Sequence, residues 1–281
     1  MGNVVLNLVF SMLLAVPYLG FSQQEILVWS DEFNGSGSPD SAFWSFEKGD
    51  HGWGNNEVQL YTDELRNARL EDGKLIIEAH KTHEGWTSAR LVSHNKVAIT
   101  YGRIDFRAKL PSGAGTWPAL WLLGENIDTL GWPVCGEIDV MEHVGRNPTQ
   151  VQCALHNAES NGDTRFKMPL TVNTYATEFH DYQLLWTPDR LEFRVDTTHY
   201  YTYRPEVKNG ANWPYDAPFF FILNIAMGGN FGSDPRFETE GLKNGIDPTL
   251  ETARMEVDYV RVYRLADSVA NPVLKRSSKD R

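Results

Sequence analysis

The stretch Gly-Glu-Ile-Asp-Val-Met-Glu-His at residues 136–143 sets Glu137, Asp139 and Glu142 among apolar side chains. Three acids on an apolar strand repel one another and are costly to remove from water, so packing alone does not account for them. Side chains alternate between the two faces of a strand, so Glu137 and Asp139 share a face. One extra residue near 140–141, a β-bulge, would turn Glu142 to the same face, and bulges are common beside active sites. The stretch therefore predicts a strand that presents carboxylates for acid–base chemistry.

An edge strand with solvated acids is the alternative interpretation, but the sequence that follows argues against it. If residues 137–142 and 151–156 form a hairpin, Glu137 lies opposite His156, which becomes a hydrogen-bond partner for the carboxylates. Gln152 and His156 then share the face of the acids, and the other face of their strand is apolar.

The chain has two cysteines, Cys135 and Cys153. In the predicted hairpin, Cys153 faces a residue near position 140 rather than Cys135, so the two sulfur atoms do not meet. We therefore expect two free thiols, although export from the cell would permit a disulfide.

A second strand carries aromatic residues on one side. Trp117, Ala119 and Trp121 share that side, while Leu120 and Leu122 point the other way and are expected in the core. The two tryptophans form either a stacking platform or part of the core. The chain contains nine Trp and eleven Tyr, an abundance that suits stacking on sugar rings as well as packing.

Short strand-like runs dominate the chain, and none of it keeps a helical period beyond about ten residues. The runs lie at 26–29, 75–80, 89–92, 102–109, 119–123, 137–143, 151–156, 182–186, 191–195, 219–226 and 255–264. Turn dipeptides such as Asn34-Gly35 and Asp72-Gly73 separate them. The pattern predicts an all-β antiparallel sandwich or barrel in one domain. The stretch 197–212 is open to interpretation as a strand or as a cleft loop.

Residues 4–21 contain no charged side chain, and we expect residues 1–22 to be a secretory signal peptide. A membrane anchor is the alternative, but Asn7, Ser11 and Pro17 interrupt a run that is already short for spanning.

At the other end, residues 266–281 lack aromatic side chains and are expected to form a flexible tail. The formal net charge of −11 argues against nucleic acid or an anionic membrane as a partner. A neutral polymer suits this charge best.

With these residues in place, the sequence resembles glycoside hydrolase family 16, and within it the laminarinase-like endo-1,3-β-glucanases. The resemblance covers residues 28–264 and includes the acid stretch with its bulge residue. Further matching stretches are Trp-Gly-Asn-Asn-Glu-Val-Gln (53–59), Gly-Arg-Ile-Asp-Phe-Arg-Ala-Lys (102–109), Thr-Trp-Pro-Ala-Leu-Trp (116–121), Phe-His-Asp-Tyr (179–182), Asn-Ile-Ala-Met-Gly-Gly-Asn (224–230) and Val-Asp-Tyr-Val-Arg-Val-Tyr (257–263). The implied fold is a concanavalin-like β-jelly roll over residues 23–265, in which two curved antiparallel sheets pack together and the concave one forms the substrate cleft.

The resemblance implies a retaining glycosidase, which needs two carboxyl groups about 5–5.5 Å apart. Glu137 is implied as the nucleophile and Glu142 as the acid/base. Asp139 lies between them and is expected to keep Glu137 ionised, by its charge and a hydrogen bond, and to help hold a proton on Glu142. His156 is expected to orient Asp139 or Glu137, and His143 only to pack beside the acid/base. No cofactor is implied for catalysis.

The resemblance also implies residues that contact the substrate. Trp117 and Trp121 would stack on glucosyl rings, and Trp132 would line the cleft from a loop. Asn56 and Arg90 resemble the polar contacts that such enzymes make with sugar hydroxyls.

Family members often bind one structural calcium ion away from the cleft. The matching positions here are Glu32, the backbone carbonyl of Gly73, and Asp258, which supply the oxygen ligands that calcium prefers. Solvated acids are the alternative interpretation of these positions.

The sequence thus predicts a secreted (extracellular or periplasmic), monomeric endo-1,3-β-glucanase that acts on laminarin-type polymers, with mixed-linkage 1,3-1,4-β-glucan as a further candidate substrate. A related galactan hydrolase, of the agarase or carrageenase type, would use the same acids; the laminarinase-like flanks and the lack of a marked basic cleft count against it. The weakest alternative is a lectin-like jelly roll that binds sugar without cleaving it, because the chain keeps Glu137, Asp139 and Glu142 together.

Overall fold

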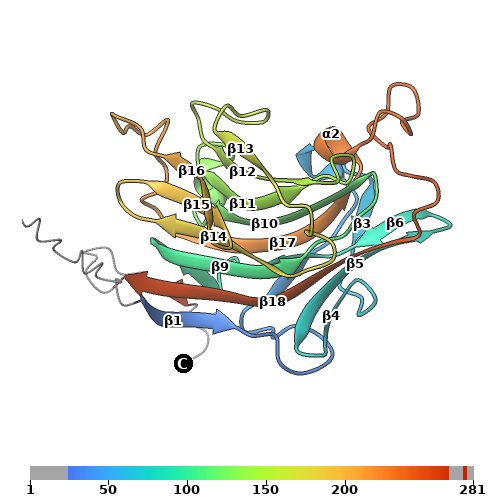
Figure 1. Ribbon diagram of the computed structural model, residues 1–281, viewed down its shortest axis with the longest axis horizontal. Coiled ribbons are helices and arrows are strands. Elements are labelled where there is room, and N and C mark those ends of the chain that lie inside the picture. Colours follow the sequence, from blue (N-terminus) through green and yellow to red (C-terminus); the bar gives the residue numbers. More distant parts are fainter. Residues whose placement is uncertain (1–24, 266–274, 277–281) are drawn as a thin grey trace, which may run out of the picture.

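The computed structural model describes residues 25–265 and the pair 275–276. These residues form two curved β-sheets that lie one over the other (Figure 1). The predicted signal peptide and most of the predicted tail lie outside the described residues. Within the described part of the chain, no helix is long and apolar enough to cross a membrane.

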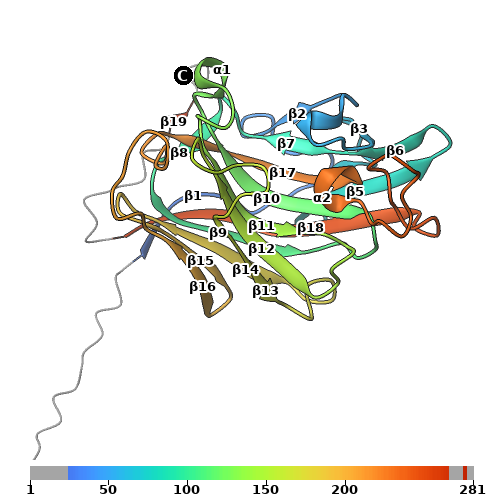
Figure 2. The same cartoon turned by 90° about the horizontal axis from the view of Figure 1, so that it is seen from above.

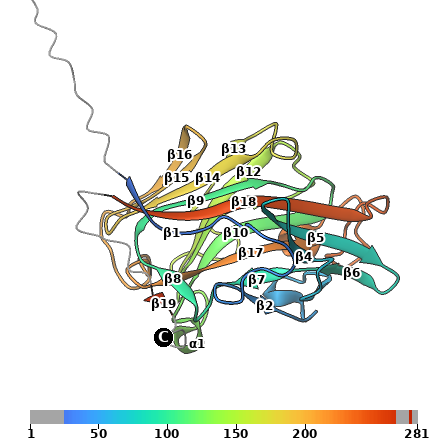
Figure 3. The same ribbon diagram turned by 90° about the horizontal axis from the view of Figure 1, so that it is seen from below.

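The first sheet has ten strands. In order across the sheet they are β16 (Thr198–Tyr203), β15 (Leu191–Val195), β14 (His180–Trp186), β9 (Gly102–Lys109), β18 (Thr252–Leu265), β5 (Lys74–Thr82), β6 (Gly85–Ser88) and β3 (Gln59–Tyr61), with β1 (Glu25–Asp31) paired to β18 and β4 (Ala68–Glu71) paired to β5. Figure 3 shows β1, β18 and β9 side by side.

The second sheet has nine strands and carries the acid stretch. Its order is β13 (Lys167–Thr171), β12 (Gln150–His156), β11 (Glu137–His143), β10 (Thr116–Gly124), β17 (Phe219–Met227), β7 (Arg90–Val92) and β2 (Ser45–Glu47), with β8 (Val97–Ile99) paired to β17 and β19 (Lys275–Arg276) paired to β8. Three short helical turns, η1 (Gly52–Gly54), α1 (Ile127–Leu130) and α2 (Gly229–Gly232), lie in the loops. Figure 2 shows α2 beside β10 and β17.

The strand pairs are antiparallel, as predicted, except that β3 and β6 run parallel. The architecture confirms the predicted all-β sandwich of two curved sheets. Each predicted run overlaps a strand, and the runs at 102–109, 137–143 and 191–195 match their strands at both ends.

Sequence reasoning missed the shorter strands β2, β3, β4, β6, β8 and β13, of three to five residues each. The stretch left open at 197–212 is a strand at its start, since β16 covers Thr198–Tyr203. Two residues of the predicted tail, Lys275 and Arg276, pair with β8.

Alternation along the strands separates a core face from a face turned away from the first sheet. In β10, Leu120 and Leu122 are fully buried in the core between the sheets, as predicted, and Ile138 and Val140 of β11 join them. A second, smaller apolar cluster covers part of the other face. Its buried members are Val92, Ala98, Leu123, Cys135, Phe220 and Ile222.

The two cysteines lie on opposite sides of the second sheet. Cys153 belongs to the core between the sheets, whereas Cys135 belongs to the smaller cluster. Both thiols are free and buried, which confirms the sequence prediction.

Candidate active site

The acids share a face because β11 contains a bulge. Asp139 pairs with Ala154 and the next pair is Glu142 with Gln152, so residues 140 and 141 together stand opposite a single residue of β12. The bulge is at the predicted position, and it turns Glu142 to the face that carries Asp139.

The imidazole of His156 links the two acids nearest to it. His156 pairs with Glu137 across the hairpin, as predicted. Its Nε2 lies 3.6 Å from Glu137 Oε1 and 3.2 Å from Asp139 Oδ2. One ligand atom from each of the three side chains lies within 4.8 Å of the others, so the group could also hold a metal ion.

Neutral N–H donors hold the two glutamates. The indole Nε1 of Trp132 donates to Glu137 Oε2 over 2.9 Å. Glu142 accepts from Trp117 Nε1 at Oε1 and from Gln152 Nε2 at Oε2, each over 3.0 Å. Within residues 25–265, no lysine or arginine forms an ion pair with either glutamate, so neutral donors orient both side chains.

The carboxylates retain a proton because they are buried together. Burial, together with the charge of Asp139, raises the pKa of Glu137 from its ordinary 4.5 to about 8, against the opposing effects of His156 and the Trp132 N–H. Burial and the charge of Glu142 hold the pKa of Asp139 well above its ordinary 3.8. The cluster therefore binds protons at pH values where isolated carboxyl groups are ionised.

This result corrects one expectation from the sequence. The charge of Asp139 does not keep Glu137 ionised; it raises the pKa of Glu137, because a neighbouring negative charge opposes ionisation. A proton held on Asp139 removes that charge, and Glu137 can then be present as the carboxylate.

A row of directly paired residues crosses the second sheet beside the acids. Glu142 pairs with Ala119, Ala119 with Asn224, and Asn224 with Arg90. Ala119 stands between Trp117 and Trp121 along β10, so a methyl group lies between two indoles on this face.

The guanidinium of Arg90 is held between two aromatic rings. Its central carbon lies 4.9 Å from the centre of the Trp53 ring and 4.7 Å from that of Trp121. Its Nε donates to Glu47 Oε2 over 2.5 Å. The predicted residues Arg90 and Trp121 therefore come together, and such stacking on indole faces suits the guanidinium.

Sequence reasoning missed Trp53 as a member of this site, although it opens the matching stretch 53–59. The predicted Asn56 follows three residues later and donates from Nδ2 to Asn230 Oδ1 over 2.8 Å. The signal that could have found Trp53 was its position in the same short motif as Asn56.

The three predicted tryptophans differ in what they contact. Trp132 is 46% exposed, while Trp117 and Trp121 are partly buried. The Nε1 of Trp121 donates to Asn224 Oδ1 over 2.8 Å, and the Trp117 ring packs edge-on against Phe231. Trp117 and Trp132 also donate to Glu142 and Glu137, a role that the sequence did not indicate.

His143 takes no part in this cluster and has a packing role, as expected. It is buried, its Nδ1 lies 2.7 Å from the carbonyl oxygen of Gln150, and its ring packs against Tyr175. Burial lowers the pKa of His143 to about 4.

The predicted calcium ligands lie on the first sheet or at its turns, away from the acids. Their oxygen donors suit calcium. Both carboxylates, however, have cationic partners. Arg261 donates to both oxygens of Glu32, over 2.9 and 2.7 Å, and Arg107 Nε lies 3.3 Å from Asp258 Oδ2. A calcium ion at this position would share Glu32 with Arg261 or displace it.

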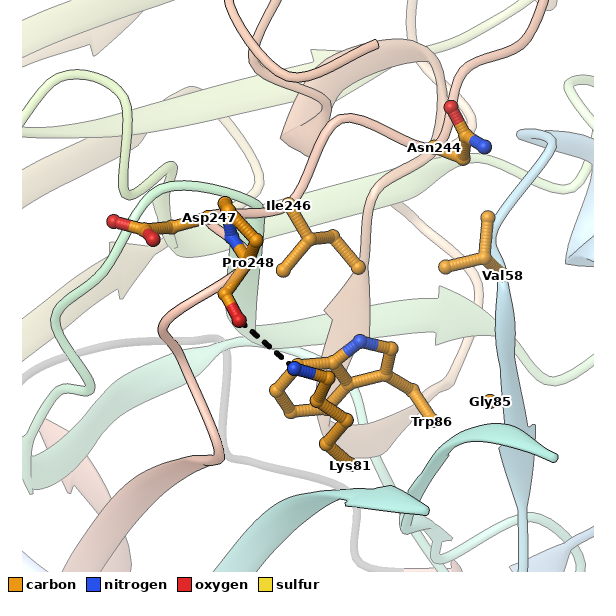
Figure 4. Close-up of a pocket in the computed structure, with 8 residues that line it drawn as sticks. All are labelled: Val58, Lys81, Gly85, Trp86, Asn244, Ile246, Asp247 and Pro248. Carbon is orange, nitrogen blue, oxygen red and sulfur yellow. Dashed lines mark hydrogen bonds between the residues drawn. The ribbon is translucent and has the colours of Figure 1, made fainter. Parts of the chain in front are cut away.

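A pocket of about 270 Å³ lies between the β5–β6 hairpin and the loop that precedes β18 (Figure 4). Trp86, Ile246 and Val58 line it, and Lys81 donates to the carbonyl of Pro248 over 2.8 Å at its edge. None of the three acids lines this pocket.

Comparisons with known proteins agree with this geometry. Residues 42–261 match the profile of the family described as Glycosyl hydrolases family 16. A beta-glucanase from Rhodothermus marinus is 46% identical over 252 residues, which cover 85% of each chain. The crystal structure of a laminarinase from Flavobacterium sp. UMI-01 superposes with a TM-score of 0.78 at 43% identity, covering 85% of this chain and 100% of the other. The catalytic domain of an endo-1,3-beta-glucanase from Thermotoga petrophila RKU-1 gives 0.77 at 37% identity, covering 87% and 100%.

The raised pKa of Glu137 predicts how the stability of the folded protein depends on pH. A carboxyl group with a raised folded-state pKa stabilises the folded protein below its ordinary pKa of 4.5, and that contribution is lost as the pH rises towards 8. Glu137→Gln has no charge to bury, so it should be more stable than the wild type at pH 8, by about 2 kcal/mol or roughly 5 °C in Tm. At pH 4.5 the two proteins should melt nearly together.

Thermal melts of both proteins at the two pH values test this. The exposed residue Glu84 supplies the control, because Glu84→Gln should leave Tm unchanged at either pH. An equal difference between wild type and Glu137→Gln at both pH values would contradict the prediction.

Proposed function

Because the chain belongs to glycosyl hydrolase family 16, we propose that it is a retaining endo-1,3-β-glucanase that hydrolyses laminarin-type glucans. One observation carries the proposal: the bulge of β11 brings Glu142 to the face of Glu137 and Asp139, where indole N–H groups hold both glutamates. Paired carboxyl groups that flank a sugar ring perform acid–base glycoside cleavage.

In the first step, a carboxylate oxygen of Glu137 attacks the anomeric carbon while Glu142 gives its proton to the leaving glycosidic oxygen. This breaks the glycosidic bond and leaves a glycosyl ester on Glu137. In the second step, Glu142 accepts a proton from water, and the water oxygen attacks the anomeric carbon. The ester bond breaks, and both glutamates return to their starting states.

The surrounding side chains have positioning roles in this scheme. Trp132 and His156 hold Glu137 from two sides, and Trp117 with Gln152 holds Glu142. When Asp139 is protonated it carries no negative charge, so it does not oppose the ionisation of Glu137.

A neutral glucan is the substrate that this surface supports best. The site presents indoles and amides, and the guanidinium of Arg90 is already paired with Glu47 and stacked on Trp53 and Trp121. The net charge of −11 disfavours highly sulfated polymers. Mixed-linkage glucan is a further candidate substrate, since a non-specific endo-beta-1,3(4)-glucanase is among the similar structures.

Product analysis tests the activity. Purified residues 23–281, incubated with laminarin, mixed-linkage glucan and agarose, should release short 1,3-linked oligosaccharides from laminarin with retention of anomeric configuration. Glu137→Gln should reduce the rate by roughly 10⁴-fold or more, because it removes the nucleophile.

Glu84→Gln, at an exposed position, should keep full activity in the same assay. Activity on agarose alone would overturn the substrate and keep the mechanism. Binding of laminarin without any products would overturn the enzymatic proposal.

We also propose that the chain is exported and acts as a monomer. The uncharged stretch at residues 4–21 supports export. Expression of the full chain in a secreting host should yield a product in the medium whose N-terminus lies near Gln23, and light scattering should give the mass of one chain. A cell-retained protein that keeps its first residue would contradict export.

A structural calcium ion remains a prediction. If Glu32, the Gly73 carbonyl and Asp258 hold calcium, millimolar calcium should raise Tm by several degrees over an EDTA-treated sample, because ligands that bind only the folded state stabilise it. Glu32→Gln should abolish that increase and leave glucanase activity unchanged. A Tm that is the same in calcium and in EDTA would mean that the Glu32–Arg261 ion pair is the final arrangement.

A further inference from the structure

We propose that Tyr61 and Asn224 are positioning residues: they form a one-directional hydrogen-bond chain from the buried carboxylate of Glu57 to the indole of Trp121, and so orient the part of the cleft wall that holds the glucan. The inference rests on the proposed function of the same site. It concerns buried residues of β3 and β17 whose side-chain hydrogen bonds link Glu57 to Trp121 and not to the acids of β11.

The hydrogen-bond chain begins at the carboxylate of Glu57, which accepts hydrogen bonds and donates none. Glu57 is 7% exposed. Its Oε2 accepts from Gln59 Nε2 over 2.8 Å and from the Tyr61 hydroxyl over 3.1 Å, and its Oε1 accepts from Asn55 Nδ2 over 3.3 Å. The hydroxyl of Tyr61 can donate one hydrogen bond, and it donates that bond to Glu57.

The direction is passed on through the amide of Asn224. Since the Tyr61 proton is committed to Glu57, the Tyr61 oxygen accepts, and Asn224 Nδ2 donates to it over 3.0 Å. This orientation of the amide leaves Asn224 Oδ1 to accept from Trp121 Nε1 over 2.8 Å. An indole can only donate, so the two ends of the chain permit a single arrangement of its middle.

Burial prevents water from replacing these partners. Tyr61 is fully buried and Asn224 is 4% exposed. Loss of one link would leave a buried donor or acceptor without a partner, which costs more than the loss of an exposed hydrogen bond.

Trp121 connects this chain to the site. It pairs with Asp139 across β10 and β11, and its ring stacks on the guanidinium of Arg90, which also stacks on Trp53. The charge of Arg90 acts on Glu57 as well: burial raises the pKa of Glu57, and Arg90 and the three donors oppose that rise. A rotation of the Trp121 ring would therefore disturb both the platform and Arg90, while the contacts of Glu137 and Glu142 would remain.

The test is a mutant cycle on laminarin. Tyr61→Phe keeps the ring and removes the hydroxyl, so Asn224 loses the acceptor that fixes its amide. We expect KM to rise about tenfold and kcat to change less than about threefold. In the Trp121→Phe background, which has no indole N–H, Tyr61→Phe should raise KM no further.

Tyr203→Phe is the matched control, because it also removes a buried hydroxyl. That hydroxyl donates to the carbonyl of Asn212 over 2.9 Å and has no part in the hydrogen-bond chain. It should lower Tm by a similar amount and leave KM unchanged. If Tyr61→Phe does not fold, Glu57→Gln takes its place in the cycle with the same expected results, because an amide that donates as well as accepts no longer dictates the direction of the chain.

Two results would overturn the inference: an unchanged KM in the Tyr61→Phe protein, or KM effects of Tyr61→Phe and Trp121→Phe that simply multiply in the double variant. A failure of the proposed function would be seen separately, in the wild type. If the wild type cleaves another polysaccharide instead of laminarin, the cycle is run on that polysaccharide, and the same outcomes apply.

Discussion

The active face of this protein depends on one extra residue in one strand. Strand alternation would send Glu142 into the core between the sheets, where an unpaired carboxylate is costly. The bulge at residues 140 and 141 prevents this and sets the acid beside Glu137 and Asp139. Ile138 and Val140 face the core by alternation, and the bulge adds Met141 to them, so the same irregularity serves both packing and chemistry. The register of the neighbouring strands β10 and β12 adjusts to it, since both pair with β11 across the same shift.

The environment of the acids is polar without being strongly cationic. Three indole or amide donors and one imidazole surround the two glutamates. A lysine or arginine bound there would hold all three carboxyl groups ionised, which is unsuitable for a site that needs one proton to donate. Instead, burial and mutual repulsion keep a proton in the cluster, and orientation comes from groups with no net charge.

Much of this site could be predicted from the sequence. The features that could not be predicted share one cause. The bulge, the pairing of Glu137 with His156 and the free cysteines follow from local alternation and register, which the sequence carries directly. The Trp53–Arg90–Trp121 stack and the contact of Trp117 with Glu142 depend on loops and on strands that are distant in the chain. Short strands such as β3 and β6 were missed because runs of three or four residues contain too few alternations to be recognised. The effect of Asp139 on Glu137 required knowing how deeply both are buried.

Ala119 has the smallest side chain in the row that crosses the second sheet beside the acids. It lies between Trp117 and Trp121 along β10 and between Glu142 and Asn224 across the sheet. These four neighbours are all larger, and Ala119 is itself buried among them. A branched side chain at this position would press on both indoles and on Glu142, while the bulge and the core face would keep their residues. Under the proposed function, a single substitution at Ala119 would therefore separate this fold from its activity without replacing any of the three acids.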